Sequence, residues 1–114
     1  RQQFDRPIGS FQAMKHMLAD MVVSTEVARA AVYAAGAHLA DPDLPGLERA
    51  ISTAKVMAGE AAVANGKTAT QVHGGMGFTW EVDVHLYLKR AWALDSRFGS
   101  RDAHCDAVAA GALG

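Results

Sequence analysis

The residues best suited to chemistry lie in two blocks that are far apart in the sequence. Residues 71–78 read Gln-Val-His-Gly-Gly-Met-Gly-Phe and place three glycines within four positions. The chain opens with Arg-Gln-Gln-Phe, and Phe11-Gln12 follows shortly after. An arginine can bind a pyrophosphate bidentately, a glutamine offers a donor and an acceptor to an adenine, and glycines let a backbone approach a ligand. Together the two blocks suggest a clamp for a dinucleotide.

The glycine block also has a purely structural interpretation. It follows a long alanine-rich helical pattern, and a glycine in that place typically ends a helix and begins a turn. The residue types leave both interpretations open. Either the block is a helix C-cap with a turn, or it is bare backbone that lies against a ligand with Gln71 and His73 beside it.

Other kinds of site have little support in the sequence. The five histidines do not have the spacing of metal ligands, and His104 and Cys105 would point in different directions on a helix. We therefore predict neither a metal site nor a thiolate nucleophile. A net charge of -1 gives no electrostatic basis for binding nucleic acid or a membrane surface. A single cysteine and the lack of a long apolar run favour a cytoplasmic protein.

Helices are expected to position both blocks, because the hydrophobic periodicity is helical throughout. Residues 11–39 and 47–72 predict two long helices joined by a short turn at 41–46, and residues 82–96 predict a third. Ser10 and Ser100 are predicted N-caps of the first and last helices. Residues 1–10 are predicted to be a loop, and no strand is expected. The apolar residues of the first helix are Met14, Leu18, Met21, Val22, Val27, Ala28, Ala31, Val32, Ala35 and Leu39.

The short connections between these helices favour antiparallel neighbours. With 114 residues, half of them hydrophobic, the chain predicts one domain, residues 1–114, with an all-α, four-helix-type up-and-down bundle. In the second helix, Gly59 and Gly66 are expected where a neighbouring backbone comes close, while Lys55 and Glu60 are expected to face solvent.

The chain resembles the C-terminal helical domain of the acyl-CoA dehydrogenase family of flavoproteins. Residues 1–8 are similar to the family's R-x-Q-F-G-x-P-I, and residues 71–78 are similar to Q-x-x-G-G-x-G-[FY]. The Phe11-Gln12 pair and the spacing between the blocks also match. The resemblance implies a segment of a longer chain, in homo- or hetero-oligomers, dimers or tetramers, that bind FAD at a subunit interface. It further implies an acyl-CoA substrate, a role in fatty acid metabolism, and an electron-transfer flavoprotein as one electron acceptor.

The resemblance also implies roles for individual residues. The FAD of a neighbouring subunit would be met near its pyrophosphate by the opening block, and its adenosine end would be held by the glycine block. The cofactor-binding residues implied in this way are Arg1, Gln3, Phe4, Phe11, Gln12, Gln71, Val72, His73, Gly74 and Gly75.

Two departures from the family pattern stand out. Many members remove the substrate α-proton with a glutamate in a Y-E-G-T motif, and Phe98 stands at the corresponding position here. An aromatic ring cannot accept that proton, so we predict no catalytic residue in this segment. Asp5 replaces a glycine of the family motif.

Several explanations for the missing base stay open. The base lies upstream, as in some relatives, or a partner subunit of a hetero-oligomer supplies it. A flavin monooxygenase or oxidase of the same fold would also lack it, and the remaining alternative is a helical interaction module without activity. We expect the isolated chain to oligomerise or to be unstable, because a bundle of this size without its preceding helix would expose apolar surface.

Overall fold

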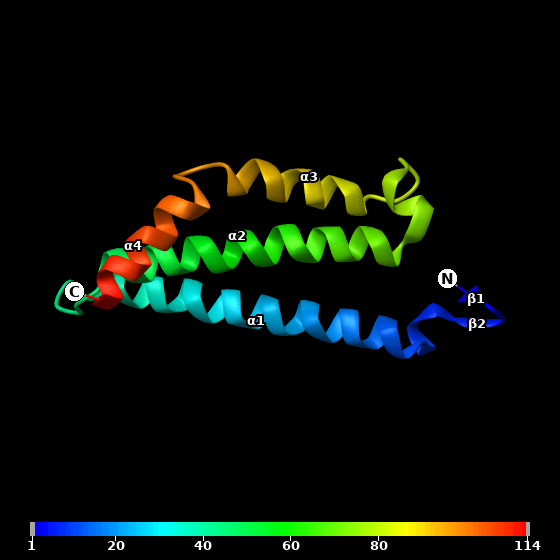
Figure 1. The fold of residues 1–114 in the computed structure, drawn as a ribbon, viewed down its shortest axis with the longest axis horizontal. Helices are drawn as coiled ribbons and strands as arrows, with labels where there is room; N and C mark the ends of the chain where they lie inside the picture. The colour runs from blue at the N-terminus through cyan, green and yellow to red at the C-terminus, as the bar shows by residue number, and fades with distance from the viewer. Residues whose placement is uncertain (1, 114) are drawn as a thin grey trace.

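The computed structural model describes residues 2–113, and its core is a set of four helices (Figure 1). These are α1 (Gln12–Ala40), α2 (Leu47–Val72), α3 (Val84–Asp95) and α4 (Arg101–Leu113), with two short 3-10 helices, η1 (Ile8–Ser10) and η2 (Gly74–Phe78). Successive long helices run antiparallel, as the short connections predict. The predicted all-α bundle is confirmed.

Helix α2 is the centre of the bundle. Helices α1 and α3 lie along opposite sides of it, and α4 crosses its first half (Figure 1). Lys55, predicted to face solvent, is instead only 19% exposed and donates a 2.7 Å hydrogen bond to the backbone carbonyl of Asp95. Glu60 lies at the surface and forms an ion pair with Arg101. The prediction for Lys55 was wrong because a central helix has few solvent-facing positions, and a polar residue there pairs with a neighbouring helix.

The side of α1 that faces α2 is a narrow seam. Its less exposed residues alternate at spacings of three and four, the repeat of a coiled-coil seam: Met14, Met17, Met21, Ser24, Ala28, Ala31, Ala35 and His38. The predicted apolar face is therefore partly wrong, since Leu18, Val22, Val32 and Leu39 remain exposed. These residues form a second apolar surface of α1.

Two glycines of α2 allow α3 to pack closely, as predicted. A Cβ atom at Gly66 would lie 3.2 Å from the Cα of Leu88 and 3.0 Å from its Cδ1. A Cβ atom at Gly59 would overlap the carboxylate of Asp95. Leu88 is consequently one of the most buried side chains in the bundle.

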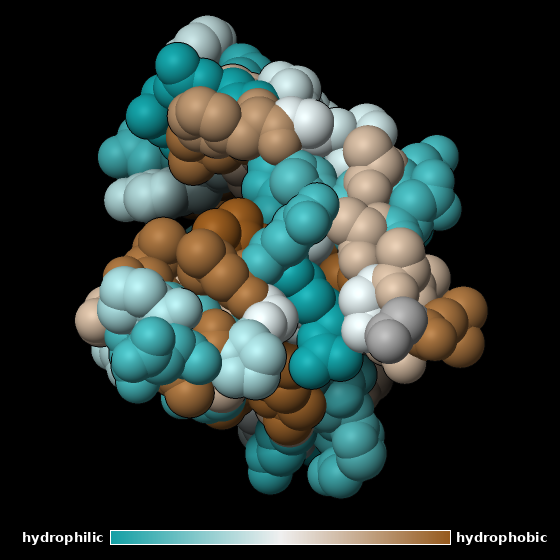
Figure 2. All heavy atoms as spheres, turned by 90° about the vertical axis from the view of Figure 1, so that its left-hand side faces the viewer, coloured by the Kyte–Doolittle hydropathy of each residue, from teal (hydrophilic) through white to brown (hydrophobic). Residues whose placement is uncertain are grey.

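The core itself is small and built mainly from alanine. The buried apolar residues are Ala28, Ala35, Ala61, Leu88 and Ala91. Large side chains such as Val22, Tyr33 and Trp80 stay exposed, and the view onto the end of the molecule that holds the α1–α2 connection shows apolar patches between polar ones (Figure 2). Exposed apolar surface of this extent favours association with further protein.

The N-terminal residues correct two predictions. Instead of a strandless loop, β1 (Gln2–Gln3) pairs antiparallel with β2 (Arg6–Pro7). Ser10 does not cap α1, because it is part of η1 and its hydroxyl donates to the Pro7 carbonyl oxygen at 2.7 Å. Phe11 occupies the N-cap position instead. Ser100 does cap α4, since its hydroxyl oxygen accepts the amide of Ala103 at 3.1 Å.

Candidate cofactor-binding site

The two predicted blocks lie at the same end of the bundle. Helix α1 begins where α2 ends, so the β1–β2 hairpin and η2 lie at the same end of the molecule, opposite the α1–α2 connection (Figure 1). We call this region, residues 2–12 and 71–80, the hairpin end. The fold thus brings together segments about 60 residues apart in sequence, as expected for antiparallel neighbours. Arg1 lies outside the described residues.

The β1–β2 turn presents an aromatic ring to solvent. Its central residues, Phe4 and Asp5, have φ angles of 55° and 59°, the pair of positive values that defines a type I′ turn. The Phe4 side chain is 82% exposed and meets the Phe11 ring edge-on, with 6.3 Å between centroids. Gln3, the other predicted residue of this strand pair, is also exposed.

Arg6 is a member of this cluster that the sequence did not reveal. Its guanidinium carbon lies 3.8 Å from the centre of the Phe11 ring, which is cation–π distance. Gln12, which follows Phe11 in the chain, is exposed. Its side-chain nitrogen lies 3.0 Å from Nε2 of His16, one helical turn further along α1. Because an amide nitrogen can only donate, Nε2 of His16 accepts this bond. The sequence could have indicated this contact, because residues four apart on a helix, such as Gln12 and His16, lie on the same face.

The glycines of the second block have three different surroundings. Gly74 has a φ of 67° and ends α2 in the left-handed conformation that favours glycine. Gly77 is buried, and a Cβ atom there would overlap the carbonyl oxygen of Thr70, a residue that is 1% exposed. Gly75 has no such constraint, because no atom of the described residues lies within 4 Å of a Cβ atom built on it. The bundle explains two of the three glycines, and Gly75 alone faces open space.

The polar residues of this block lie beside that open backbone. Gln71 and His73 are exposed, while Val72 and Gly74 are partly buried. The amide of His73 donates to the Ala69 carbonyl oxygen at 3.2 Å, so its backbone continues the end of α2. The turn then closes with Thr79, whose hydroxyl donates to the Met76 carbonyl oxygen at 2.8 Å.

Trp80 adds a further exposed ring at the hairpin end. Its ring meets His85 edge-on at 4.9 Å between centroids, and Nζ of Lys89 lies 5.0 Å from the ring centre. His85 is buried and donates from Nδ1 to the Val82 carbonyl oxygen at 2.8 Å. The indole is thus held by α3 while its outer face stays in solvent.

Phe98 lies away from the hairpin end, in the turn between α3 and α4. It is 84% exposed and has a φ of 62°, an outlier for an aromatic residue. Its carbonyl oxygen accepts a 2.6 Å hydrogen bond from Nε2 of His104, and Nδ1 of His104 lies 3.0 Å from the hydroxyl of Ser52. Since a carbonyl oxygen can only accept, Nε2 carries a proton, and Nδ1 of a neutral ring accepts from Ser52.

The carboxylates near Phe98 are engaged elsewhere or fully exposed. Asp95 lies 3.5 Å from Nζ of Lys55, and Asp102 is exposed in the first turn of α4. The hydrogen bond and the charge of Glu60 raise the pKa of Arg101 above its ordinary value, so this guanidinium stays protonated.

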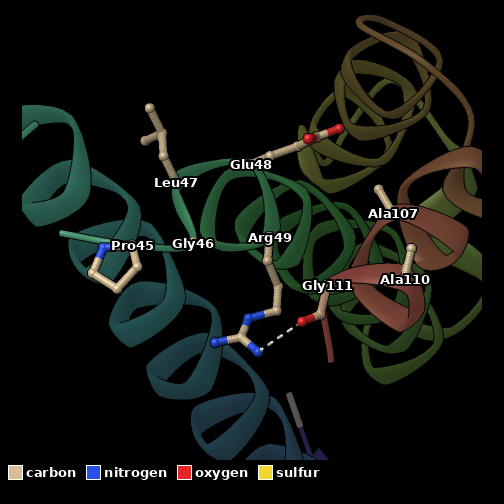
Figure 3. Close-up of a pocket in the computed structure, with 8 residues that line it drawn as sticks. All are labelled: Pro45, Gly46, Leu47, Glu48, Arg49, Ala107, Ala110 and Gly111. Carbon is tan, nitrogen blue, oxygen red and sulfur yellow. Dashed lines mark hydrogen bonds between the residues drawn. The ribbon is translucent and has the colours of Figure 1, made fainter. Parts of the chain in front are cut away.

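One hollow lies at the opposite end of the bundle (Figure 3). It has a volume of about 510 Å³ and lies between the start of α2 and the last turns of α4. Arg49 points toward α4, where its guanidinium lies 3.5 Å from the Gly111 carbonyl oxygen, while Leu47 points away (Figure 3). None of the predicted cofactor-binding residues lines it.

Residues 2–113 contain neither a metal-binding cluster nor a membrane-spanning helix. No group of three or more histidines, cysteines and carboxylates in this part of the chain is arranged to hold a metal ion. Among the described helices, none is both long and apolar enough to cross a membrane.

Comparison with known proteins identifies the family. The model of the acyl-CoA dehydrogenase C-terminal domain matches residues 1–113. The chain belongs to the acyl-CoA dehydrogenase family. It is 46% identical over 99 residues to acyl-CoA dehydrogenase FadE34 of Mycobacterium tuberculosis, covering 87% of this chain and 14% of the relative.

Other members of the family show similar coverage. Acyl-CoA dehydrogenase IpdE2 of the same organism is 46% identical over 80% of this chain and 26% of its own length. The 3-sulfinopropanoyl-CoA desulfinase of Paraburkholderia xenovorans is 37% identical over 80% of this chain and 23% of its own length. The chain thus spans about a quarter or less of these acyl-CoA dehydrogenase relatives, and it corresponds to a C-terminal domain of the family.

Proposed function

We propose that this domain holds part of an FAD molecule in an oxidoreductase that dehydrogenates an acyl-CoA thioester between its α and β carbons. The observation that carries the proposal is the open space around Gly75, which the packing of the bundle does not explain. A glycine backbone with free space above it, flanked by the exposed side chains of Gln71 and His73, suits close contact with a ligand. Family membership supports the choice of FAD.

The donor set of the hairpin end fits such a cofactor. The amide groups of Gln71 and Gln12 can pair with the donor and acceptor edge of an adenine, and Phe4 and Phe11 offer ring faces and edges for apolar contact. Arg6, held against Phe11, supplies a positive charge for a pyrophosphate, with Arg1 as the residue that the family motif implies. When bound, FAD would accept a hydride from the acyl β-carbon.

The α-proton must be accepted by a group outside this domain. Phe98 cannot accept a proton, and Asp95 is paired with Lys55. We propose that the base is supplied from upstream in the chain or by a partner subunit. The exposed apolar residues of α1, among them Val22 and Val32, support assembly into dimers or tetramers.

A second function is favoured by the same lack of a base. One relative is named as a desulfinase of 3-sulfinopropanoyl-CoA, so similarity to this domain is compatible with another reaction of a CoA thioester. Two further alternatives would also lack the base: a partner subunit of a hetero-oligomer, and a flavin monooxygenase or oxidase of the same fold. Anaerobic addition of an acyl-CoA series to the whole protein separates them. Bleaching of the visible flavin band supports dehydrogenation, and a band that persists with every thioester favours the alternatives.

Flavin content tests the cofactor site directly. Gly75→Leu in the whole protein should lower the ratio of FAD to protein after gel filtration, because its side chain fills the space proposed for the ligand. Gly36→Leu is the matched control, since Gly36 also has open space around its Cβ position but lies near the C-terminal end of α1, far from the hairpin end. Equal flavin content in both variants and the unchanged protein would contradict the proposed site.

A further inference from the structure

We propose that Asn65 sets the register of α1 against α2 and is thereby the positioning residue for the two halves of the proposed FAD site. The consequence for FAD rests on the proposed function, whereas the register itself does not. Asn65 lies on α2 and faces the seam of α1, about two turns before the end of its helix. No ligand contact is assigned to it.

Both ends of the Asn65 amide are bonded to one turn of α1. Its Oδ1 accepts from the Ser24 hydroxyl at 2.9 Å. Its Nδ2 donates to the Met21 carbonyl oxygen at 3.2 Å and to Oγ1 of Thr25 at 3.0 Å. The Thr25 hydroxyl in turn donates to the Met21 carbonyl oxygen at 2.7 Å. The hydroxyls of Ser24 and Thr25 and the Met21 carbonyl oxygen therefore all hydrogen-bond to the Asn65 side chain.

This set of partners exists at one level of α1 only. Ser24 and Thr25 are the only serine and threonine in Gln12–Ala40. A slip of α1 by one heptad would place Asn65 opposite Met17 and Leu18 or opposite Ala31 and Val32, where side chains offer it no hydrogen bond. A polar residue in an apolar seam is a well-attested device for fixing register.

The rest of the seam discriminates poorly between registers. Ala28, Ala31 and Ala35 face a stretch of α2 that is itself rich in alanine, including Ala58, Ala61 and Ala62. Small side chains of equal size interdigitate equally well after a slip, so their packing specifies position weakly. The methionines at the start of the seam are flexible and adapt to more than one packing. Along the seam, the register is thus specified by the Asn65 hydrogen bonds, in addition to the constraint of the short connection between α1 and α2.

The register matters because the two halves of the proposed site lie on different helices. With Ser24 opposite Asn65, antiparallel counting places Met17 opposite Val72, so Phe11 and Gln12 come level with the glycine turn. A slip of one heptad would displace these halves by about 10 Å, at a rise of about 1.5 Å per residue. A single dinucleotide could not then contact both.

Disulfide trapping in the whole protein measures the register of α1 against α2. In a Cys105→Ser background, the pair Ala28→Cys with Ala61→Cys reports the native register, because both residues line one hollow. The pairs Ala28→Cys with Ala54→Cys, and Ala28→Cys with Thr68→Cys, report slips of one heptad in either direction. Loss of three ordinary hydrogen bonds in Asn65→Leu should lower the preference for the native register about a hundredfold, so the slipped pairs should cross-link. Native cross-linking at the unchanged rate, without slipped products, would overturn the proposal.

A relocation variant separates register from local packing and covers the case in which Asn65→Leu does not fold. Ala58→Asn with Ala31→Ser and Val32→Thr, added to Asn65→Leu, Ser24→Ala and Thr25→Val, moves the same polar set one heptad along the seam without leaving hydroxyls at the old level. Recovery of the native cross-link supports a register function, and failure to recover it while Asn65→Leu is defective assigns Asn65 a local role and overturns the proposal.

Flavin content of the same variants tests the positioning of the site. FAD should fall severalfold in Asn65→Leu and return in the relocation variant. If the cross-links shift while flavin content does not, Asn65 does not position the site. If the unchanged protein binds no FAD, the proposed function fails, and the cross-linking result still decides the register.

Discussion

The hairpin end and the α3–α4 turn both reverse the chain with left-handed residues, but they are supported in different ways. At the hairpin end, the residues with positive φ are Phe4, Asp5 and Gly74; the Phe4 ring meets Phe11 edge-on, and the Thr79 hydroxyl donates to the Met76 carbonyl oxygen. In the α3–α4 turn, Phe98 and Gly99 have positive φ, and side chains of other helices hold the backbone. His104 and Lys55 donate to the carbonyl oxygens of Phe98 and Asp95.

This difference separates a structural turn from one that suits a ligand. Lys55 of α2 and His104 of α4 donate hydrogen bonds to backbone carbonyl oxygens of the α3–α4 turn and fix it to the bundle. The hairpin end leaves amides, rings and the Gly75 backbone at the surface. Residues in such sparsely populated backbone conformations cluster at functional sites.

The largest effect on this comparison is expected from Gly77→Ala. The added Cβ atom would overlap the Thr70 carbonyl oxygen and lie 3.1 Å from the Thr70 Cγ2, and the overlapped atom is backbone, which cannot rotate away as a flexible side chain could. We expect a loss of about 3 kcal/mol in the free energy of unfolding, as for severe overpacking. Chemical unfolding of the whole protein measures it.

Gly75→Ala in the same turn is the control. Because open space surrounds its Cβ position, we expect stability within about 0.5 kcal/mol of the unchanged protein. A comparable loss in both variants would show that the turn is intolerant of any side chain, and the distinction between the glycines would be wrong.

His104→Ala should break the α3–α4 turn. It removes the bonds to the Phe98 carbonyl oxygen and to Ser52, a residue that is 4% exposed, and it leaves that buried hydroxyl without its partner. We expect a loss of about 2 kcal/mol in unfolding free energy. Ser52→Ala, alone and combined with His104→Ala, completes a double-mutant cycle. Strictly additive losses would mean that the two side chains do not support the turn together.

Most of the fold could be predicted from the sequence. Helical periodicity predicted all four ends of α1 and α2 to within one residue, and the small residues Gly59 and Gly66 indicated close packing on α2. The face of α1 was less predictable, because Leu18 and Val22 are as apolar as the residues of the seam. Which apolar stripe is buried depends on the partner helix, and a single helix does not encode that choice.

The site was predictable in its parts but not in its contacts. The sequence indicated Gln71 and the three glycines, yet it could not separate Gly75 from Gly77, because that distinction depends on the position of Thr70 in the folded turn. The hairpin was missed since Phe4 and Asp5 are unusual residues for a type I′ turn, which favours Asn-Gly. Arg6 and Asn65 could not be predicted, because their contacts with Phe11 and with Met21 form only in the folded chain.

The smallest effect is expected at Asp5, where it tests whether the hairpin end contains strain without side-chain support. Asp tolerates a φ of 59° better than most residues but less well than glycine. Asp5→Gly should stabilise the hairpin by about 0.5 kcal/mol, so the β1 amide hydrogens should exchange about twofold more slowly. Asp5→Ala should weaken the hairpin, so the same amides should exchange about twofold faster. The unfolding midpoint of the bundle should not change, because the exposed hairpin opens without the helices. Equal exchange in both variants would mean that the turn is held by contacts other than its own backbone, and the hairpin end would then resemble the α3–α4 turn.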